Sequence, residues 1–339
     1  MDTEIRIVID TFTLSKLSLR FTGKFVTQAI TNAIYRKLIN GILCPAPEFV
    51  RYKEIPHSSH LSEEVLAHRI GLIPLICDDT QIASFIKKRN VCGCVERCDK
   101  CLVRMKLDIK SDPVEVTEEM IMNNEHVFNI YSDDIQVLDN EHYNIRITPG
   151  IPLMAIRYGD TLSLEIDAVF NSAIEHAKWQ CTVAVSMTPV STVILDHSVL
   201  SGVEIPDIET LYDTFSKSCP RDILKIDHKT KKPIVDEHKK YDCTHCQRCE
   251  YVSREIGLVN PKTTKKFCKA IDTDAYRLTF ESNGVMSTGK ILQHALYYLE
   301  QDLRDLCDFF YTSIPQYNDD DDLKNDMEDI DYTSILSSC

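Results

Sequence analysis

Apolar and polar side chains alternate at the start of the sequence. Residues 4–9 and 17–21 follow the two-residue period of half-buried strands, so they predict a hairpin-like pair. From Lys24 the period becomes helical, and Gly41 and Pro45 bring this helix to its end. One helix on two strands cannot cover so wide an apolar face, so another part of the chain or another chain must complete it. The face consists of Phe25, Val26, Ala29, Ile30, Ala33, Ile34 and Leu38.

A second apolar stripe lies near the other end of the sequence. Residues 276–284 predict a strand and a turn, and large apolar side chains then recur at helical spacing behind Ser287, the expected N-cap. Gly289 and Lys290 supply no capping box, so we expect the first turn of this helix to fray. An exposed stripe of this size predicts a partner. The stripe consists of Leu292, Leu296, Leu299, Leu303, Leu306 and Phe310.

The middle of the chain combines a short helix with strands. The helix begins after Ser62, a good N-cap, and ends at Gly71 and Pro74. Strict alternation further on predicts strands, with a turn at Pro149–Gly150, and together these elements indicate a mixed sheet domain. The expected strands span residues 102–109, 143–147 and 162–166.

The short helix also carries two side chains that invite a catalytic interpretation, His68 and Arg69. Leu66 and Ile70 share its apolar face. No acidic or nucleophilic residue stands at a usable spacing from His68 and Arg69. We therefore expect them to hydrogen-bond neighbouring carbonyl groups rather than to act in catalysis.

Composition narrows the class of protein. The 339 residues are 43% hydrophobic and 27% charged, and no apolar run reaches the roughly 18 residues of a membrane span. Half of the net charge of −14 lies in residues 319–331, an acidic stretch expected to be a solvated tail. Apart from four lysines at 262–269, no basic stripe is present to bind phosphates, which argues against direct sequence-specific binding of nucleic acid. The ten glycines form no dinucleotide-binding array.

Four cysteines lie within ten residues, with the spacing C-x-C-x3-C-x2-C. Core packing does not explain so dense a set, and the start of the chain has no secretory signal that would favour disulfides. Paired thiolates in tight loops are typical ligands of tetrahedral zinc. The sequence therefore predicts a zinc site formed by Cys92, Cys94, Cys98 and Cys101.

A second cysteine set consists of Cys219, which precedes a proline, and Cys243, Cys246 and Cys249 at x2 spacing. Three close cysteines and a remote one resemble half of a ferredoxin, in which such a set holds an iron–sulfur cluster. Four thiolates also suit zinc, and spacing does not determine the metal. An iron–sulfur cluster, zinc and a metal-free remnant therefore remain open for this set.

Several ordered segments resemble the alpha-type assembly subunits of cellular RNA polymerases. Residues 66–75, Leu-Ala-His-Arg-Ile-Gly-Leu-Ile-Pro-Leu, resemble the family signature, and residues 176–179 resemble its His-Ala-Lys-Trp segment. In the first helix Asn32, Ala33 and Arg36 match an Ala-Asn-Ala-Leu-Arg-Arg segment, where Thr31 and Tyr35 depart from it. The zinc-type loop follows at the place where the third-largest subunit of RNA polymerase II carries one, and an archaeal counterpart is also similar.

The resemblance implies an α+β fold with a two-layer dimerisation domain, made of a sheet plus two helices. A mixed α/β insert domain with a zinc loop and a ferredoxin-like subdomain interrupts it. We expect the following division: residues 1–45 and 269–312 form the dimerisation domain, 46–200 the insert domain with the zinc loop at 88–103, 201–268 the ferredoxin-like metal-binding insertion and 313–339 an acidic disordered tail.

The resemblance also implies a function. It predicts a non-catalytic assembly subunit of a DNA-directed RNA polymerase that pairs with a smaller alpha-like subunit and holds the second-largest subunit and small zinc-bearing subunits. Its location would be the nucleus, or the cytoplasm or virion if a large DNA virus encodes it. The alternative is an iron–sulfur electron carrier built on the second cysteine set. The expected pairing interface comprises Phe25, Ala29, Asn32, Ala33, Arg36, Leu292, Leu296, Leu299, Leu303 and Leu306.

Overall fold

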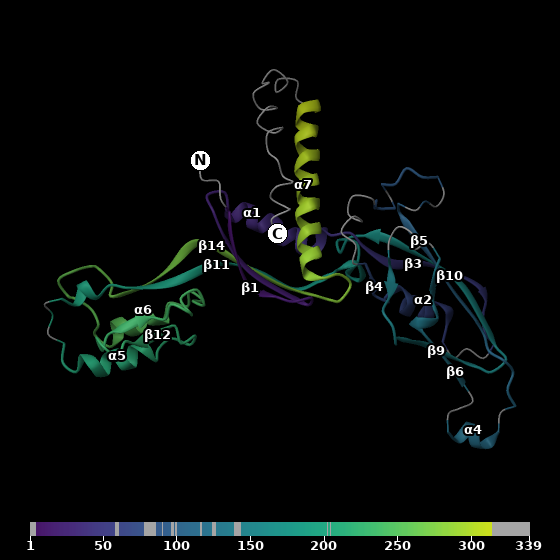
Figure 1. The fold of residues 1–339 in the computed structure, drawn as a ribbon, viewed down its shortest axis with the longest axis horizontal. Helices are drawn as coiled ribbons and strands as arrows, with labels where there is room; N and C mark the ends of the chain where they lie inside the picture. The colour runs from purple at the N-terminus through teal and green to yellow at the C-terminus, as the bar shows by residue number, and fades with distance from the viewer. Residues whose placement is uncertain are drawn as a thin grey trace. The chain divides into compact units, whose positions relative to one another are not determined.

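The computed structural model forms two compact units, each made of two separate stretches of chain. Unit 1 consists of Met1–Tyr35 and Thr182–Asn283, and unit 2 of Arg36–Cys181 and Gly284–Cys339. Figure 1 shows the elements of both units. The structure describes residues 5–57, 61–77, 86–89, 91–95, 98, 100–115, 117–123, 127–138, 144–201, 203 and 205–313. The acidic stretch at 319–331 lies outside them.

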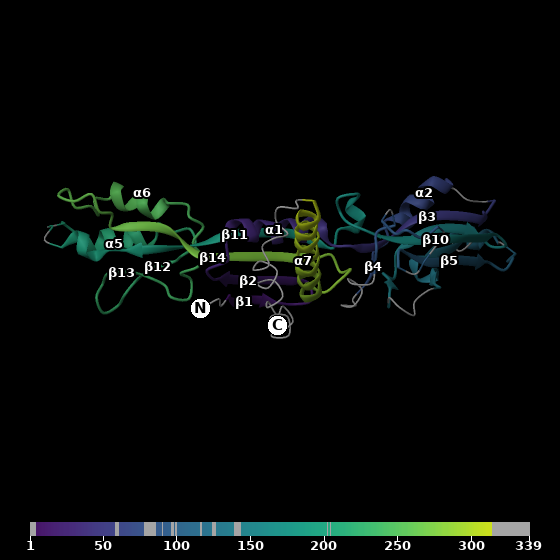
Figure 2. The same cartoon turned by 90° about the horizontal axis from the view of Figure 1, so that it is seen from above.

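Unit 1 is organised around a four-stranded antiparallel sheet of order β1-β2-β14-β11. β1 (Arg6–Phe12) and β2 (Lys16–Thr22) confirm the predicted hairpin, and Figure 2 shows β2 between β1 and β14. β14 (Cys268–Ser282) and β11 (Thr182–Leu195) are the long strands of the sheet. The core of the sheet contains Leu17, Leu19, Phe21, Leu278 and Phe280.

The first helix begins later than its sequence period predicts. α1 spans Gln28–Arg36 and continues as a π-helical turn, η1 (Lys37–Gly41). The expected start at Lys24 is wrong because hydrogen-bonded turns occupy the preceding residues, where the Val26 N–H donates to the Gly23 carbonyl and the Thr27 N–H to the Phe25 carbonyl. Phe25 therefore precedes the helix. The predicted end at Gly41 is confirmed.

Between β11 and β14 the chain forms a small subdomain with its own core. Its elements are η4 (His197–Leu200), α5 (Ile208–Ser216), β12 (Leu224–Ile226), β13 (Pro233–Val235) and α6 (Arg248–Glu255). The rings of Tyr212 and Phe267 stack with centroids 6.1 Å apart, and Phe215 meets Phe267 edge-on at 5.5 Å. Buried aromatic packing of this kind stabilises a subdomain of this size.

Unit 2 contains the second four-stranded antiparallel sheet, of order β3-β10-β5-β7. Leu107, Leu164, Ile166 and Phe170 lie fully buried in its core. Two small ribbons, β4 with β8 and β6 with β9, and the helices α2 and α4 complete a domain that combines helices with antiparallel sheets. The bounds are β3 (Cys44–Glu54), α2 (Glu63–Gly71), β4 (Leu75–Ile76), β5 (Leu102–Lys110), α4 (Glu118–Met122), β6 (Val127–Tyr131), η2 (Ser132–Asp134), β7 (Gln136–Val137), β8 (Arg146–Ile147), β9 (Pro152–Arg157), β10 (Thr161–Asn171) and η3 (Ala177–Trp179).

The helices of unit 2 begin where their caps predict. Ser62 Oγ accepts a hydrogen bond from the Val65 N–H at the start of α2, and Leu66 and Ile70 are buried, as expected. The long helix α7 (Thr288–Ser313) begins directly after Ser287. Thr288 and Ile291 are fully buried in its first turn, so packing holds the turn that lacks a capping box. None of the helices in the described ranges is long and apolar enough to cross a membrane.

Candidate metal centre and helix faces

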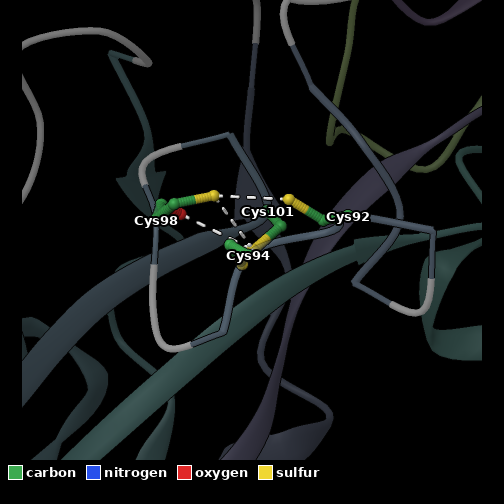
Figure 3. Close-up of side chains that lie close together, drawn as sticks. All are labelled: Cys92, Cys94, Cys98 and Cys101. Carbon is green, nitrogen blue, oxygen red and sulfur yellow. Dashed lines mark hydrogen bonds between the residues drawn. The ribbon is translucent and has the colours of Figure 1, made fainter.

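The four thiols of the first cysteine set converge in the loop that precedes β5 (Figure 3). Their sulfur atoms all lie within 4.8 Å of one another. The Sγ–Sγ distances are 3.4 Å for Cys92–Cys98, 3.5 Å for Cys98–Cys101 and 3.7 Å for Cys94–Cys101. Four sulfurs at about 2.3 Å from a tetrahedral zinc ion would be about 3.8 Å apart. The donor set therefore fits zinc in type, number and spacing.

Backbone hydrogen bonds shape this loop. The Lys87 N–H donates to the Lys100 carbonyl at 2.8 Å and closes the base of the loop. The Cys92 N–H donates to the Lys88 carbonyl at 2.9 Å, and the Cys101 N–H to the Cys98 carbonyl at 3.2 Å. Cys101 is fully buried next to the first residue of β5, so the sheet anchors one ligand directly.

The electrostatics of the loop favour a bound cation. Desolvation, followed by hydrogen bonds with the neighbouring thiols, raises the pKa of Cys94 to about 12. At Cys98 desolvation also acts to raise the pKa, but hydrogen bonds from Cys92 and from the Lys100 backbone bring it down to about 7. A divalent cation at the centre would stabilise the ionised form of all four thiols.

Arg89 also contacts this site, although it is not part of the cysteine pattern. The Arg89 guanidinium donates from its NH1 group to Cys94 Sγ at 2.8 Å and to Cys101 Sγ at 3.3 Å. An arginine before a cysteine-rich loop has no distinctive spacing. The sequence therefore contained no signal that would have identified it.

The second cysteine set is not assembled in the same way. Cys246 is exposed, Cys249 is buried in the first turn of α6, and Cys243 forms an isolated β-bridge with Ser191. Within the described ranges, only the first set brings three or more candidate ligand atoms within 4.8 Å of one another. Cys219 packs at the edge of the subdomain core.

A fifth thiol, Cys268, belongs to this neighbourhood. A hydrogen bond from Cys268, which begins β14, is the main cause that lowers the pKa of Cys249 to about 7, and the same contact raises the pKa of Cys268 itself. The sequence interpretation missed Cys268 because it follows the x2 array at a distance and shares no local motif with it.

Arginines attach the chain next to Cys243 to the sheet of unit 1. Arg20 pairs with Asp10, with its NH2 group 2.7 Å from Oδ1, and its guanidinium lies 4.8 Å from the centre of the Tyr241 ring. Arg277 donates to the Tyr241 carbonyl at 3.0 Å. Charge-assisted contacts of this kind fix the position of a loop.

The nearby side chains Ser191, His245 and Asp272 do not form a catalytic relay. Ser191 Oγ donates to Asp272 Oδ1 at 2.6 Å, and His245 Nδ1 lies 2.7 Å from the same oxygen. A nucleophile–base–acid chain requires the histidine between the hydroxyl and the carboxylate, with one ring nitrogen toward each. Here one carboxylate oxygen of Asp272 contacts both the Ser191 hydroxyl and the His245 ring, so we assign these three side chains a structural role.

The two signature segments line one cavity of about 540 Å³ in unit 2, although they are far apart in the sequence. His68 and Leu72 contribute from one segment, and His176 and Lys178 from the other. The Lys178 ammonium donates to the Pro47 carbonyl at 2.8 Å and pairs with the Glu48 carboxylate. Trp179 is buried and donates from Nε1 to the Val169 carbonyl at 3.1 Å.

Arg69 fulfils the structural role expected for it. Its NH2 group donates to the Pro152 carbonyl at 2.6 Å and so links α2 to β9. For Arg69 the expectation of a carbonyl hydrogen bond is therefore confirmed.

The predicted interface residues divide into exposed and internally packed groups. On α7, Leu292, Leu296 and Leu299 are half-buried within unit 2, whereas the exposed fractions of Leu303 and Leu306 are 55% and 51%. Phe309 and Phe310 extend this apolar surface toward the end of the helix. Near and on α1, Phe25, Ala29, Asn32 and Arg36 are exposed, and Ala33 is half-buried.

Comparison with known proteins agrees with this arrangement. The sequence family described as the RNA polymerase Rpb3/RpoA insert domain matches residues 52–190. The DNA-directed RNA polymerase II subunit rpb3 of Dictyostelium discoideum is 24% identical, over 82% of this chain and 86% of its own length. The subunit Rpo3 of Methanosphaera stadtmanae is 26% identical, over 77% of this chain and 86% of its own length. The subunit rpac1 of polymerases I and III of D. discoideum is 24% identical, over 79% of this chain and 71% of its own length.

The fold and the site define a mixed α+β protein with antiparallel sheets, a compact four-cysteine loop and exposed apolar helix faces. Such features are typical of a protein that assembles with other chains. The chain is similar to the alpha-type subunits Rpb3 and Rpo3 of RNA polymerases, and residues 52–190 match the Rpb3/RpoA insert domain.

Proposed function

We propose that this chain is a non-catalytic assembly subunit of a multisubunit DNA-directed RNA polymerase and acts in transcription. The observation that carries the proposal is the likeness to subunits of polymerase II, of polymerases I and III and of archaeal polymerases, which extends over most of both chains. The chain itself contributes structure to an enzyme complex and no catalytic residues.

Its first role is to pair with a smaller alpha-like subunit. Support comes from the exposed apolar side chains of α7, Leu303, Leu306, Phe309 and Phe310, which water would otherwise surround. The exposed residues Ala29, Asn32 and Arg36 of α1 offer a separate surface for this pairing.

Its second role is to hold the second-largest subunit and small zinc-bearing subunits through the insert domain. Support comes from the cavity between the two signature segments, where His68, His176 and the exposed Phe49 and Leu72 offer polar and apolar contacts to another chain. The likeness to polymerase II subunits makes the nucleus the proposed location, or the cytoplasm or virion if a large DNA virus encodes the protein.

Zinc at Cys92, Cys94, Cys98 and Cys101 would cross-link the loop before β5 and supply structure rather than chemistry. For Cys219, Cys243, Cys246 and Cys249, zinc or an iron–sulfur cluster requires the sulfurs to move closer together. Iron and zinc counting after anaerobic purification distinguishes the two metals. An electron carrier built on this set gains no support from the geometry of the described residues.

The pairing is tested by co-expression with the smaller alpha-like subunit. Replacing Leu303 and Leu306 by aspartate places two charges on the pairing face, and we expect co-purification to fall at least tenfold. Leu138→Asp is the matched control, because its side chain is exposed at 49% outside the proposed interface. Equal recovery of the partner with both variants would contradict the proposed pairing face.

A further inference from the structure

We propose that Arg89 is a positioning residue of the cysteine loop, which holds two of the four thiolates in place for the metal and offsets their charge. The inference rests on the proposed binding of zinc. The juxtaposition that carries it is the Arg89 guanidinium beside Cys94 Sγ at 2.8 Å and Cys101 Sγ at 3.3 Å.

The two sulfurs that Arg89 contacts come from different parts of the loop. Cys94 belongs to the Cys-x-Cys pair, whereas Cys101 is anchored at the start of β5. One nitrogen of the rigid, planar Arg89 guanidinium therefore connects Cys94, in the Cys-x-Cys pair, to Cys101 at the start of β5. The two sulfurs that share this nitrogen lie 3.7 Å apart.

Charge gives the same side chain a second role. Zinc with four thiolates carries a net charge of about −2, which is costly in a partly buried site unless positive groups lie near. A hydrogen bond to a charged sulfur is stronger than one between neutral groups, and partners of metal ligands tune both affinity and electronics. Arg89 is half-buried, so water screens this interaction less than on an open surface.

The two residues that precede Arg89 each make a contact outside the loop's cysteines. The Lys87 N–H bonds the Lys100 carbonyl at 2.8 Å, and the Lys88 ammonium donates to Ser172 Oγ at 3.3 Å. Ser172 is 1% exposed and begins the segment that contains Trp179. Arg89 thus follows two residues that link the cysteine loop to Lys100 and to the buried Ser172.

The experiment compares metal affinity in the whole chain, co-expressed with its smaller partner. Arg89→Ala removes charge and donors, and Arg89→Lys keeps the charge without the planar group. Lys87→Ala removes one positive charge from an exposed side chain two positions away. In competition with a chromophoric chelator, we expect Arg89→Ala to lose zinc affinity by about 10–100-fold, the usual effect of removing a partner of a metal ligand. Arg89→Lys should lose less, and Lys87→Ala should match the wild type.

Cobalt substitution separates this role from a general effect on folding. Hydrogen bonds to a thiolate stabilise its lone pairs, so both Arg89 variants should shift the sulfur-to-cobalt charge-transfer band to lower energy. If Arg89→Ala kept the wild-type zinc affinity and charge-transfer band, the inference would be overturned, but the proposal of a zinc site would stand. The same holds if Arg89→Lys kept both the wild-type affinity and the wild-type band. A wild-type chain that binds neither zinc nor cobalt at these cysteines would overturn the zinc proposal together with the inference.

Discussion

At the scale of single residues, Cys101 is the ligand that joins the metal loop to the fold. Its side chain is fully buried, and the next residue begins β5, the strand that pairs with β10 through the core of unit 2. The other three ligands lie on a loop with little apolar surface of its own, since Val91 and Val95 are 70% and 98% exposed. Metal binding must therefore supply the order of the loop.

Replacing Cys98 and Cys101 by serine should release one zinc per chain. Structural zinc in small loops binds with an apparent free energy of about 10–16 kcal/mol, so its loss should leave the loop without fixed structure. Elemental analysis measures the metal, and amide hydrogen exchange across residues 87–101 measures the order. Cys307→Ser, on α7, is the control and should keep both. Unchanged zinc in the double variant would exclude these thiols as the ligands.

Residues that act through local spacing were predictable, and residues brought together by the fold were not. The compact array of four cysteines and the N-cap Ser62 carry their signal within a few positions. Arg89 and Cys268 carry none, because their roles depend on which sulfur the folded chain places beside them. A metal at the second cysteine set, Cys219 with Cys243, Cys246 and Cys249, stays a prediction, because it too depends on which sulfurs the folded chain brings together.

At the scale of elements, the turn between β9 and β10 depends on one glycine. Gly159 has a φ of +93°, its N–H donates to Ser111 Oγ at 3.0 Å, and an added Cβ would lie 3.6 Å from Pro113 Cβ. Only glycine adopts this conformation without strain.

Gly159→Ala should therefore destabilise unit 2 by about 1–2 kcal/mol, the cost of a left-handed conformation for a residue with a Cβ. Thermal unfolding of the co-expressed pair, followed by circular dichroism, measures the change. Gly71→Ala is the control, because φ there is not in the left-handed range and the nearest atom, the Pro47 carbonyl oxygen, is 3.8 Å from the added Cβ. A larger loss in the control than in Gly159→Ala would contradict this account of the turn.

Periodicity predicted the kinds of element more reliably than their ends. The hairpin at the start of the chain and the strands around 102–109 and 162–166 follow from alternation, and the structure confirms them. The strand expected at 143–147 is reduced to Arg146–Ile147, paired with β4, and Tyr143 lies outside the described residues. The start of α1 was placed too early because the apolar period continues through the turn at Phe25.

At the scale of the whole molecule, large apolar side chains are exposed on elements of both units within the described residues, a feature typical of surfaces that bind other chains. The last turns of α7 and the edge strand β1 carry such side chains, with Leu306, Phe309 and Ile9 each at least half exposed. An edge strand with apolar side chains is also a site for pairing with other chains.

Expressed without its partner, the chain should self-associate or aggregate at micromolar concentration. Sedimentation velocity should then show a broad distribution of sizes, which the smaller alpha-like subunit should convert to one species with both chains in equal amounts. A concentration-independent monomer would contradict the need for a partner.

The central claim is that this chain is an assembly subunit of an RNA polymerase, and its direct test is the composition of the native complex. A tagged chain, purified from its own cells at moderate salt, is analysed by quantitative mass spectrometry beside Leu303→Asp with Leu306→Asp. The account predicts stoichiometric recovery of a smaller alpha-like subunit and the second-largest polymerase subunit with the wild-type chain, and loss of the smaller alpha-like subunit with the variant. Recovery of the wild-type chain in a complex without polymerase subunits would contradict it.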